Sequence, residues 1–251
     1  MFTVNTVIII IFIQQECQIS TQQCVITCGP LETENNTAKS ILLSRLLCNS
    51  KIVPGSGAKW QEVLTYWFGP GAEKKWFNGG PAVDAEIRKK FGKLVDEAYQ
   101  GGLKDWELDP KPSLALIILC DQFTRNIYKG TPKAFGGDVR ARVMTSKFLE
   151  RSTHDHRKHS LSERSFIYMP LMHSENIQDQ VTSVQLYERL AQDATSTPYA
   201  QQTRLNFDFA KKHKEVVDRF GRYPQRNAVL QRQNSPEEQE FLDNLPDKYK
   251  W

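Results

Sequence analysis

The chain has 251 residues, of which 39% are hydrophobic and 25% charged, and this composition is typical of a soluble globular protein. Its net charge is +4, but Lys and Arg alternate with Asp and Glu and form no basic block, so we expect no nucleic-acid partner. The five cysteines include no CxxC pair, which argues against a disulfide framework and favours a reducing compartment.

The first segment of the chain combines a short apolar run with a polar stretch. The run "VIIIIFI" (Val7–Ile13) is far shorter than the roughly 20 residues of a membrane-spanning helix, so we expect no membrane partner. It also lacks the basic flank and the small-residue cleavage site of a signal peptide. We predict that residues 1–56 form a poorly structured extension and that the protein is cytoplasmic. Organelle targeting or secretion is the alternative if the apolar run is functional.

Residues 57–251 show helical periodicity almost without interruption. "WQEVLTYWFG" spaces its apolar residues for one helix face and stops at Gly69. Two capping boxes mark helix starts, Ser160 with Glu163 and Ser235 with Glu238. No run alternates apolar and polar residues with a period of two. We therefore predict a single all-α domain of about eight to ten helices.

The segment "LALIILCDQFTRNIY" (Leu114–Tyr128) begins as core and then turns polar without a turn signal. At 100° per residue, Asp121 and Arg125 lie on the same arc as the apolar Leu114. Either the helix emerges into solvent with a surface ion pair, or the arc stays buried and forms the wall of a polar pocket. Cys120, at the end of the apolar run, is predicted to be a core residue. The polar candidates of this segment are Asp121, Gln122, Arg125 and Asn126.

Two further segments place polar residues on apolar faces. If "HSENIQDQVTSVQLYERLA" forms one helix, His173 and Gln180 share the face that later carries Tyr187, and Glu175 points roughly the other way. In "FDFAKKHKEVVDRFG", His213 lies within the apolar stripe. Buried polar groups need partners, so a lone histidine bonded to a carbonyl is one reading and a shared polar network is the other.

The segment "FGRYPQRNAVLQR" brings two arginines to a junction between helices. Gly221 is expected to end one helix and Pro224 to begin the next, which places Arg226 and Asn227 in a first helical turn. The free N–H groups of a helix start favour anions, and Arg222 and Arg226 would strengthen that preference. Pairing of these arginines with acidic residues of neighbouring helices is the alternative.

Several of these stretches together resemble a known family. "YWFG", "KKWF", "DQFTRNIYKGTPKAF", "MPLMHSENIQDQ" and "HKEVVDRFGRYPQRNAVLQRQNSPEE" are similar to the family catalogued as domain of unknown function number 924, from about Trp60 to Leu242. The resemblance implies an all-helical fold like that of the tetratricopeptide superfamily, without an established activity. Tyr223 and Gln225 stand where the family pattern usually has Phe and His, and Gln231 replaces a Gly. The missing His weakens a proton-transfer role at this junction.

Other chemistries are not supported by motifs. The chain has no P-loop, no GxGxxG after a strand, no GxSxG and no HExxH, so we predict no cofactor. His173 and Glu175 would diverge on one helix, and the three histidines of "HDHRKH" (His154–His159) are expected in a linker, where they would bind metal only adventitiously. We therefore predict no metal site.

Two functions of different classes follow from these observations. In the first, the domain binds a small anionic ligand, and His173 or His213 is the acid–base candidate if a reaction follows, so that enzymatic activity stays open. In the second, the domain is a scaffold for a protein partner and its polar network is structural. The predicted binding residues are Asp121, Gln122, Arg125, Asn126, His173, Glu175, Gln180, Arg222, Arg226 and Asn227.

Overall fold

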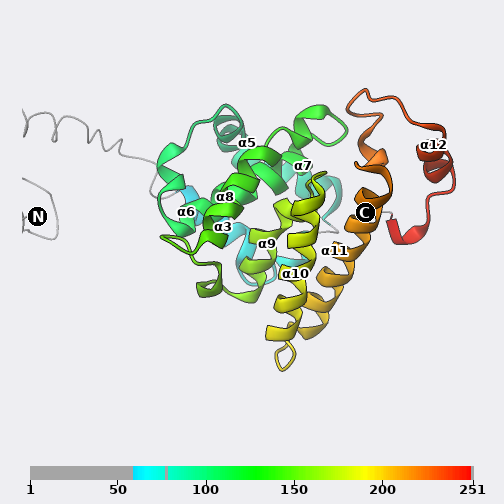
Figure 1. Cartoon of the computed structure of the whole chain (residues 1–251). Coiled ribbons are helices and arrows are strands. Elements are labelled where there is room, and N and C mark those ends of the chain that lie inside the picture. The colour runs from blue at the N-terminus through cyan, green and yellow to red at the C-terminus, as the bar shows by residue number, and fades with distance from the viewer. Residues whose placement is uncertain (1–58, 77–78, 250–251) are drawn as a thin grey trace, which may run out of the picture. The chain divides into compact units, whose positions relative to one another are not determined.

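A computed structural model describes residues 59–76 and 79–249 (Figure 1). These residues form helices and turns, and none of them is in a β-strand, so the prediction of an all-α domain is confirmed. The predicted extension 1–56 lies outside the described residues. The resemblance to the tetratricopeptide superfamily stays a prediction.

The helices follow one another with short connections. The α-helices are α3 (Lys59–Phe68), α4 (Glu73–Trp76), α5 (Gly80–Tyr99), α6 (Pro110–Ile117), α7 (Thr124–Ile127), α8 (Asp138–Glu150), α9 (Leu161–Met172), α10 (Ile177–Asp193), α11 (Ala200–Phe220) and α12 (Pro236–Asp243). The 3₁₀ helices are η1 (Lys104–Glu107), η3 (Pro132–Phe135), η4 (His156–Lys158), η5 (Pro224–Arg226) and η6 (Asp247–Tyr249).

The predicted helix ends are largely those of the structure. Both capping boxes form: the Ser160 side chain accepts from the Glu163 backbone at the start of α9, and Ser235 and Glu238 do the same for α12. Gly221 ends α11 in the left-handed conformation with φ 69°. Local side-chain chemistry therefore sets these ends, because the first N–H groups and last carbonyls of a helix need partners outside it.

Between α6 and α7 the chain forms a π-helical segment, η2 (Ile118–Phe123). The backbone continues from α6 through η2 into α7 without a break, and every residue of η2 is buried. A π-helical turn contains more residues than an α-helical turn, so side chains after it are rotated away from the faces predicted at 100° per residue. Such segments are often found at functional sites, and Asp121 and Gln122 lie within this one.

Aromatic side chains build the core beside η2. Phe123 contacts Trp67 of α3 edge-on at 5.3 Å between ring centroids and stacks on Phe91 of α5 at 5.1 Å. Trp67 in turn contacts Phe166 of α9 at 5.5 Å. These contacts join helices that are distant in sequence and fix η2 at the centre of the domain.

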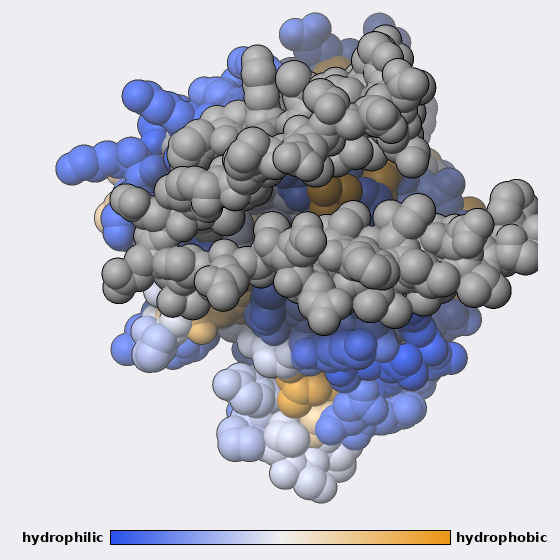
Figure 2. All heavy atoms as spheres, turned by 90° about the vertical axis from the view of Figure 1, so that its left-hand side faces the viewer, coloured by the Kyte–Doolittle hydropathy of each residue, from blue (hydrophilic) through white to orange (hydrophobic). Residues whose placement is uncertain are grey.

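Helices α9, α10 and α11 pack against one another, and α10 and α11 form a long hairpin (Figure 1). A smaller apolar cluster joins the end of α11 to α12 through Val217, Tyr223 and Phe241. The face shown in Figure 2 is mostly hydrophilic where described residues are coloured. No helix of the described residues is long and apolar enough to cross a membrane.

The structure corrects one sequence prediction about histidine. "HSENIQDQVTSVQLYERLA" is not one helix, because α9 ends at Met172, His173 caps its C-terminus and Asn176 caps the start of α10. The "HDHRKH" segment lies in the connection between α8 and α9, as expected, and within it His154 and His156 are buried, with His154 bonded to Ser113 and His156 to Tyr168.

Candidate functional site

The candidate site is a polar cluster around Asp121, a carboxylate with no solvent exposure. Its Oδ1 lies 2.8 Å from Nδ1 of His173 and 3.3 Å from Nη2 of Arg125. Its Oδ2 accepts from the side-chain amide of Gln122, which also contacts the sulfur of Met169. The predicted buried arc is therefore present, and η2 and the end of α9 bring its members together.

Asp138, the first residue of α8, provides a second carboxylate. Its Oδ1 accepts from Nη2 of Arg125 at 3.0 Å. The close approach of α8 to η2 depends on Gly137, because a Cβ at this position would lie 2.2 Å from the carbonyl oxygen of Cys120. The absence of a side chain at Gly137 thus allows Asp138 to reach Arg125.

Arg226 reaches the cluster from η5. Its guanidinium contacts two aromatic rings, with Cζ 4.8 Å from the centroid of Phe135 and 4.4 Å from that of Tyr223. Its Nη2 donates to the carbonyl of His173 at 2.9 Å, and its Nη1 lies 3.7 Å from Oδ2 of Asp138. Cation–π contacts hold the orientation of the guanidinium plane, but the ion pair with Asp138 is long for a charged hydrogen bond.

The two histidines that were predicted as acid–base candidates face each other. The ring centroids of His173 and His213 are 6.2 Å apart. His213 uses Nδ1 to donate to the Phe209 carbonyl at 2.9 Å, and burial lowers its pKa to about 3, so it is neutral at pH 7. His173 uses Nδ1 toward Asp121, and no residue within 59–76 or 79–249 bonds to its Nε2. This free nitrogen makes His173 the better candidate for proton transfer.

Burial and charge shift the ionisation of the cluster in different directions. The His173 and Arg125 side chains hold the pKa of Asp121 at about 2 despite its burial. Burial raises the pKa of Asp138, although Arg125 opposes this. Burial and the nearby Arg125 lower the pKa of Arg226. The negative charge of Asp121 is therefore well balanced by its neighbours, whereas the positive charge of Arg226 is balanced only in part.

The cluster is not fully closed to solvent. The side chains of Arg125, His173 and Arg226 expose 24%, 16% and 15% of their surface. These fractions are too large for a sealed core and too small for free surface groups.

Three predicted binding residues lie elsewhere. Asn126 donates to Asp84 at 2.7 Å and borders a separate surface hollow with Arg88 and Lys129. Arg222 pairs with Glu238 at 2.6 and 2.7 Å, outside the Asp121 cluster. The structure thus places both residues outside the Asp121 cluster, with Asn126 directed toward α5 and Arg222 directed toward α12 by the turn after Gly221, and their role in binding stays a prediction.

Asn227 is the third of these residues, and it belongs to a structural loop. Its side chain has no solvent exposure, donates to Asn234 at 2.7 Å and accepts from Arg232 at 2.9 Å. The short helix before it, η5, is a single 3₁₀ turn. One such turn presents few aligned N–H groups, so it offers little support for the predicted anion site at a helix start, which stays a prediction.

Glu175 and Gln180 support the cluster from behind. Glu175 pairs with both terminal nitrogens of Arg232, at 2.7 and 2.9 Å, whereas Arg125 pairs with Asp121 and Asp138. The Gln180 amide, fully buried, donates to the hydroxyl of Tyr223 at 2.7 Å and lies near the Met172 carbonyl. These two residues position the segment that carries His173 and Tyr223, and neither makes a hydrogen bond to Arg226.

The sequence analysis missed three participants, Phe135, Asp138 and Arg232. Asp138 had a weak signal, because an acid after two glycines at a helix start is a typical N-terminal residue. For Phe135 and Arg232 the sequence contains no signal other than their position in the stretches that resemble the family. No group of three or more His, Cys, Asp or Glu that could hold a metal ion occurs among the described residues.

Comparisons with known proteins agree with this geometry in fold and supply no activity. The family model described as "Bacterial protein of unknown function (DUF924)" matches residues 63–245. The solved structure of the protein of unknown function ATU0120 from Agrobacterium tumefaciens is similar, with 29% sequence identity and a TM-score of 0.65 over 76% of this chain and 99% of that chain. No curated protein matches. The chain belongs to the DUF924 family.

Proposed function

We propose that the cluster of Arg125, His173 and Arg226 binds a small oxyanion, such as a carboxylate or a phosphate. The incomplete compensation of Arg226 is the observation that carries this proposal. Its guanidinium has five N–H groups, yet among the described residues it makes one hydrogen bond and one ion pair of 3.7 Å. A buried cation in such a position is costly unless an anion approaches it.

The sharing of Asp138 explains why Arg226 is left with spare donors. Arg125 takes the short contact with this carboxylate at 3.0 Å, and Arg226 is left with the long one. The two aromatic rings contact the guanidinium of Arg226 without accepting a conventional hydrogen bond, so its N–H edge stays available for further bonds. A carboxylate or phosphate fits such an edge with two parallel hydrogen bonds.

The scaffold alternative receives less support from the surface. A protein-docking groove needs a contiguous exposed apolar area. The large exposed apolar side chains of the described residues instead come from α5, α8, α10, α11 and the residues that flank η1 and α11. These residues are Tyr99, Leu108, Val139, Val143, Ile177, Tyr199, Leu205 and Phe209.

The proposal is tested by thermal denaturation in the presence of acetate, sulfate and inorganic phosphate. A specific anion at about 100 times its Kd adds about 2.7 kcal/mol to the free energy of unfolding, which raises Tm by about 5–10 °C for a domain of this size. Arg226→Gln should lose most of this increase, since it removes the charge and keeps much of the side-chain volume.

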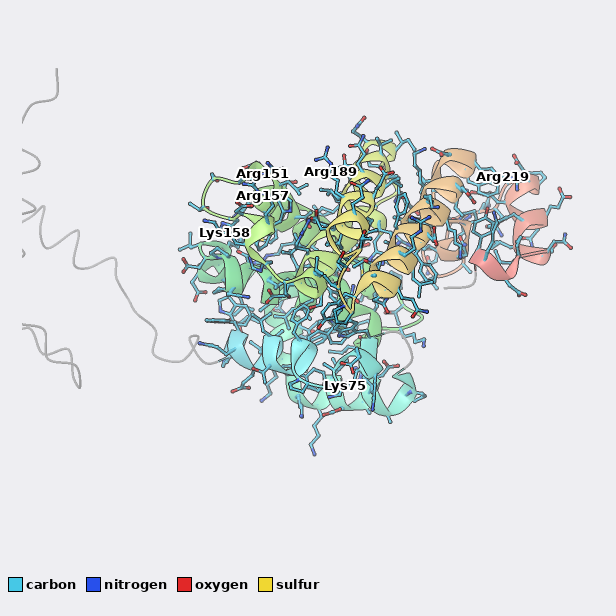
Figure 3. All side chains as sticks on the ribbon, turned by 90° about the horizontal axis from the view of Figure 1, so that it is seen from below. Lys75, Arg151, Arg157, Lys158, Arg189 and Arg219 are labelled. Carbon is cyan, nitrogen blue, oxygen red and sulfur yellow. The ribbon has the colours of Figure 1, made fainter. Side chains whose placement is uncertain are left out.

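Arg219→Gln is the matched control. Arg219 lies on α11 beside α12, pairs with Glu237 at 2.9 Å and is half exposed (Figure 3). It should keep the full increase of Tm. An equal increase in wild type and Arg226→Gln, or no increase with any of the three anions, would contradict the proposed function.

A further inference from the structure

We infer that the surface hollow between α5 and α7 is a second ligand site and that it binds a small phosphorylated polyol. The hollow has a volume of about 440 Å³, within the range of roughly 300–1,000 Å³ that is usual for small-molecule sites. None of its lining residues belongs to the Asp121 cluster, so the inference is independent of the proposed function. Its charged and polar lining consists of Asp84, Arg88, Lys89, Asn126 and Lys129.

One side of α5 forms the larger wall of this hollow. The lining residues of α5 are three or four positions apart, so they share one side of the helix, and the core residues Ile87, Phe91 and Leu94 occupy the other. The hollow begins at the first turn of α5, where no side chain caps the helix. The partial positive charge of this helix end adds to the charges of the lining and favours an anion.

Three cations and one carboxylate line the hollow. Arg88, Lys89 and Lys129 together with Asp84 leave a net charge of +2. Within residues 59–76 and 79–249, none of the three cations forms an ion pair with Asp or Glu. Most of the positive charge in the hollow is therefore available to a ligand.

Two hydrogen bonds across the hollow hold its polar groups in place. Arg88 lies four residues after Asp84 on the same helix, yet its Nη2 donates to the carbonyl of Ile127. The side-chain amide of Asn126 donates to Oδ1 of Asp84 at 2.7 Å. Oδ2 of Asp84 and Oδ1 of Asn126 accept no hydrogen bond from the part of the chain that the structure describes. These two oxygens can therefore accept hydrogen bonds from a ligand.

The cations and the free oxygens select different parts of one ligand. A phosphomonoester carries a charge of roughly −1.5 to −2 at pH 7, which matches the net charge of the hollow, and a single carboxylate would leave one positive charge unmatched. Arginine and lysine both bind phosphate oxygens. The two free oxygens require donors on the rest of the ligand. Hydroxyl groups supply these donors without the positive charge that an ammonium group would bring next to the cations.

Isothermal titration calorimetry of the full chain at pH 7.5 tests this inference, with glucose 6-phosphate as the probe. Wild type should bind glucose 6-phosphate more tightly than inorganic phosphate and should not bind glucose detectably. The double variant Lys89→Gln, Lys129→Gln should bind glucose 6-phosphate at least about tenfold more weakly, since it loses two charged hydrogen bonds. Lys93→Gln is the matched control, because Lys93 is exposed on the same helix and does not line the hollow. It should keep the Kd of wild type.

Asn126→Ala tests the recognition of the hydroxyl groups. The substitution removes an acceptor and leaves the charge of the hollow unchanged. It should therefore weaken glucose 6-phosphate binding about fivefold and leave the Kd of inorganic phosphate as it is in wild type. Inorganic phosphate that binds wild type as tightly as glucose 6-phosphate would refute the polyol as the ligand class.

Two further results would overturn the site itself. One is the absence of glucose 6-phosphate binding in wild type, or an equal Kd in wild type and the double lysine variant. The other is loss of binding in Arg226→Gln together with full binding in the double lysine variant, which would place the ligand in the Asp121 cluster. Both substituted lysines are exposed, and the Tm of each variant without ligand shows that its fold is intact.

Discussion

Replacement of Asp121 by Asn tests how much the buried cluster contributes to stability. The substitution keeps the shape of the side chain and removes a charge that interacts with His173 and Arg125. The pKa of Asp121 is about 2, compared with an ordinary value of 3.8, and this difference corresponds to roughly 2 kcal/mol of stability at pH 7. The NH₂ group of the new Asn side chain would also point at another donor, either the amide of Gln122 or Nδ1 of His173. The lost hydrogen bond costs roughly 1–3 kcal/mol more. We expect a loss of about 3–5 kcal/mol.

Urea denaturation at pH 7 measures this loss, with an unchanged slope showing that the unfolding reaction is the same. Because the pKa of Asp121 is lowered in the folded state, its contribution is present above pH 3.8 and disappears as the pH falls toward 2. The difference between wild type and Asp121→Asn should therefore shrink on acidification. Asp218→Asn, which removes an exposed pair with Lys214, should cost less than about 1 kcal/mol. A loss below about 1 kcal/mol for Asp121→Asn would refute the reasoning.

Three further predictions concern other parts of the chain. Gln231 has φ 54°, a conformation that favours glycine, so Gln231→Gly should leave urea stability unchanged or raise it by up to about 1 kcal/mol; a clear loss would contradict this strain. Burial and the nearby Arg164 lower the pKa of His156 to about 4. Its unfolded form therefore binds more protons between pH 6.5 and 4, and wild type should lose roughly 3 kcal/mol more than His156→Gln across this range; parallel pH profiles would disprove the shift. Deletion of residues 1–56, which lack helical periodicity, should change Tm by less than about 4 °C, as measured by calorimetry, and aggregation of the shortened protein would show that "VIIIIFI" packs on the domain.

Local sequence signals were sufficient for the helical class and for several helix ends. Ser160 and Ser235 cap their helices through groups within four residues, and Gly221 ends α11 through its own backbone freedom. These interactions need no distant partner, so they can be read from the order of residues alone. The apolar arc of Asp121 left two readings open, a surface ion pair or a buried polar wall, and the structure shows the buried one.

The composition of the cluster depended on tertiary structure. The π-helical turn of η2 has no local sequence signal, and the partners of its neighbourhood come from distant segments: Asp121 bonds to His173 and Asn126 bonds to Asp84. Asp138 reaches Arg125 only because Gly137 packs against the carbonyl of Cys120, a contact between segments that the sequence does not connect. Periodicity determines which face of a helix is buried, but the partner of each buried charge is set by how separate helices pack, and this is why the sequence predicted a polar cluster without predicting its members.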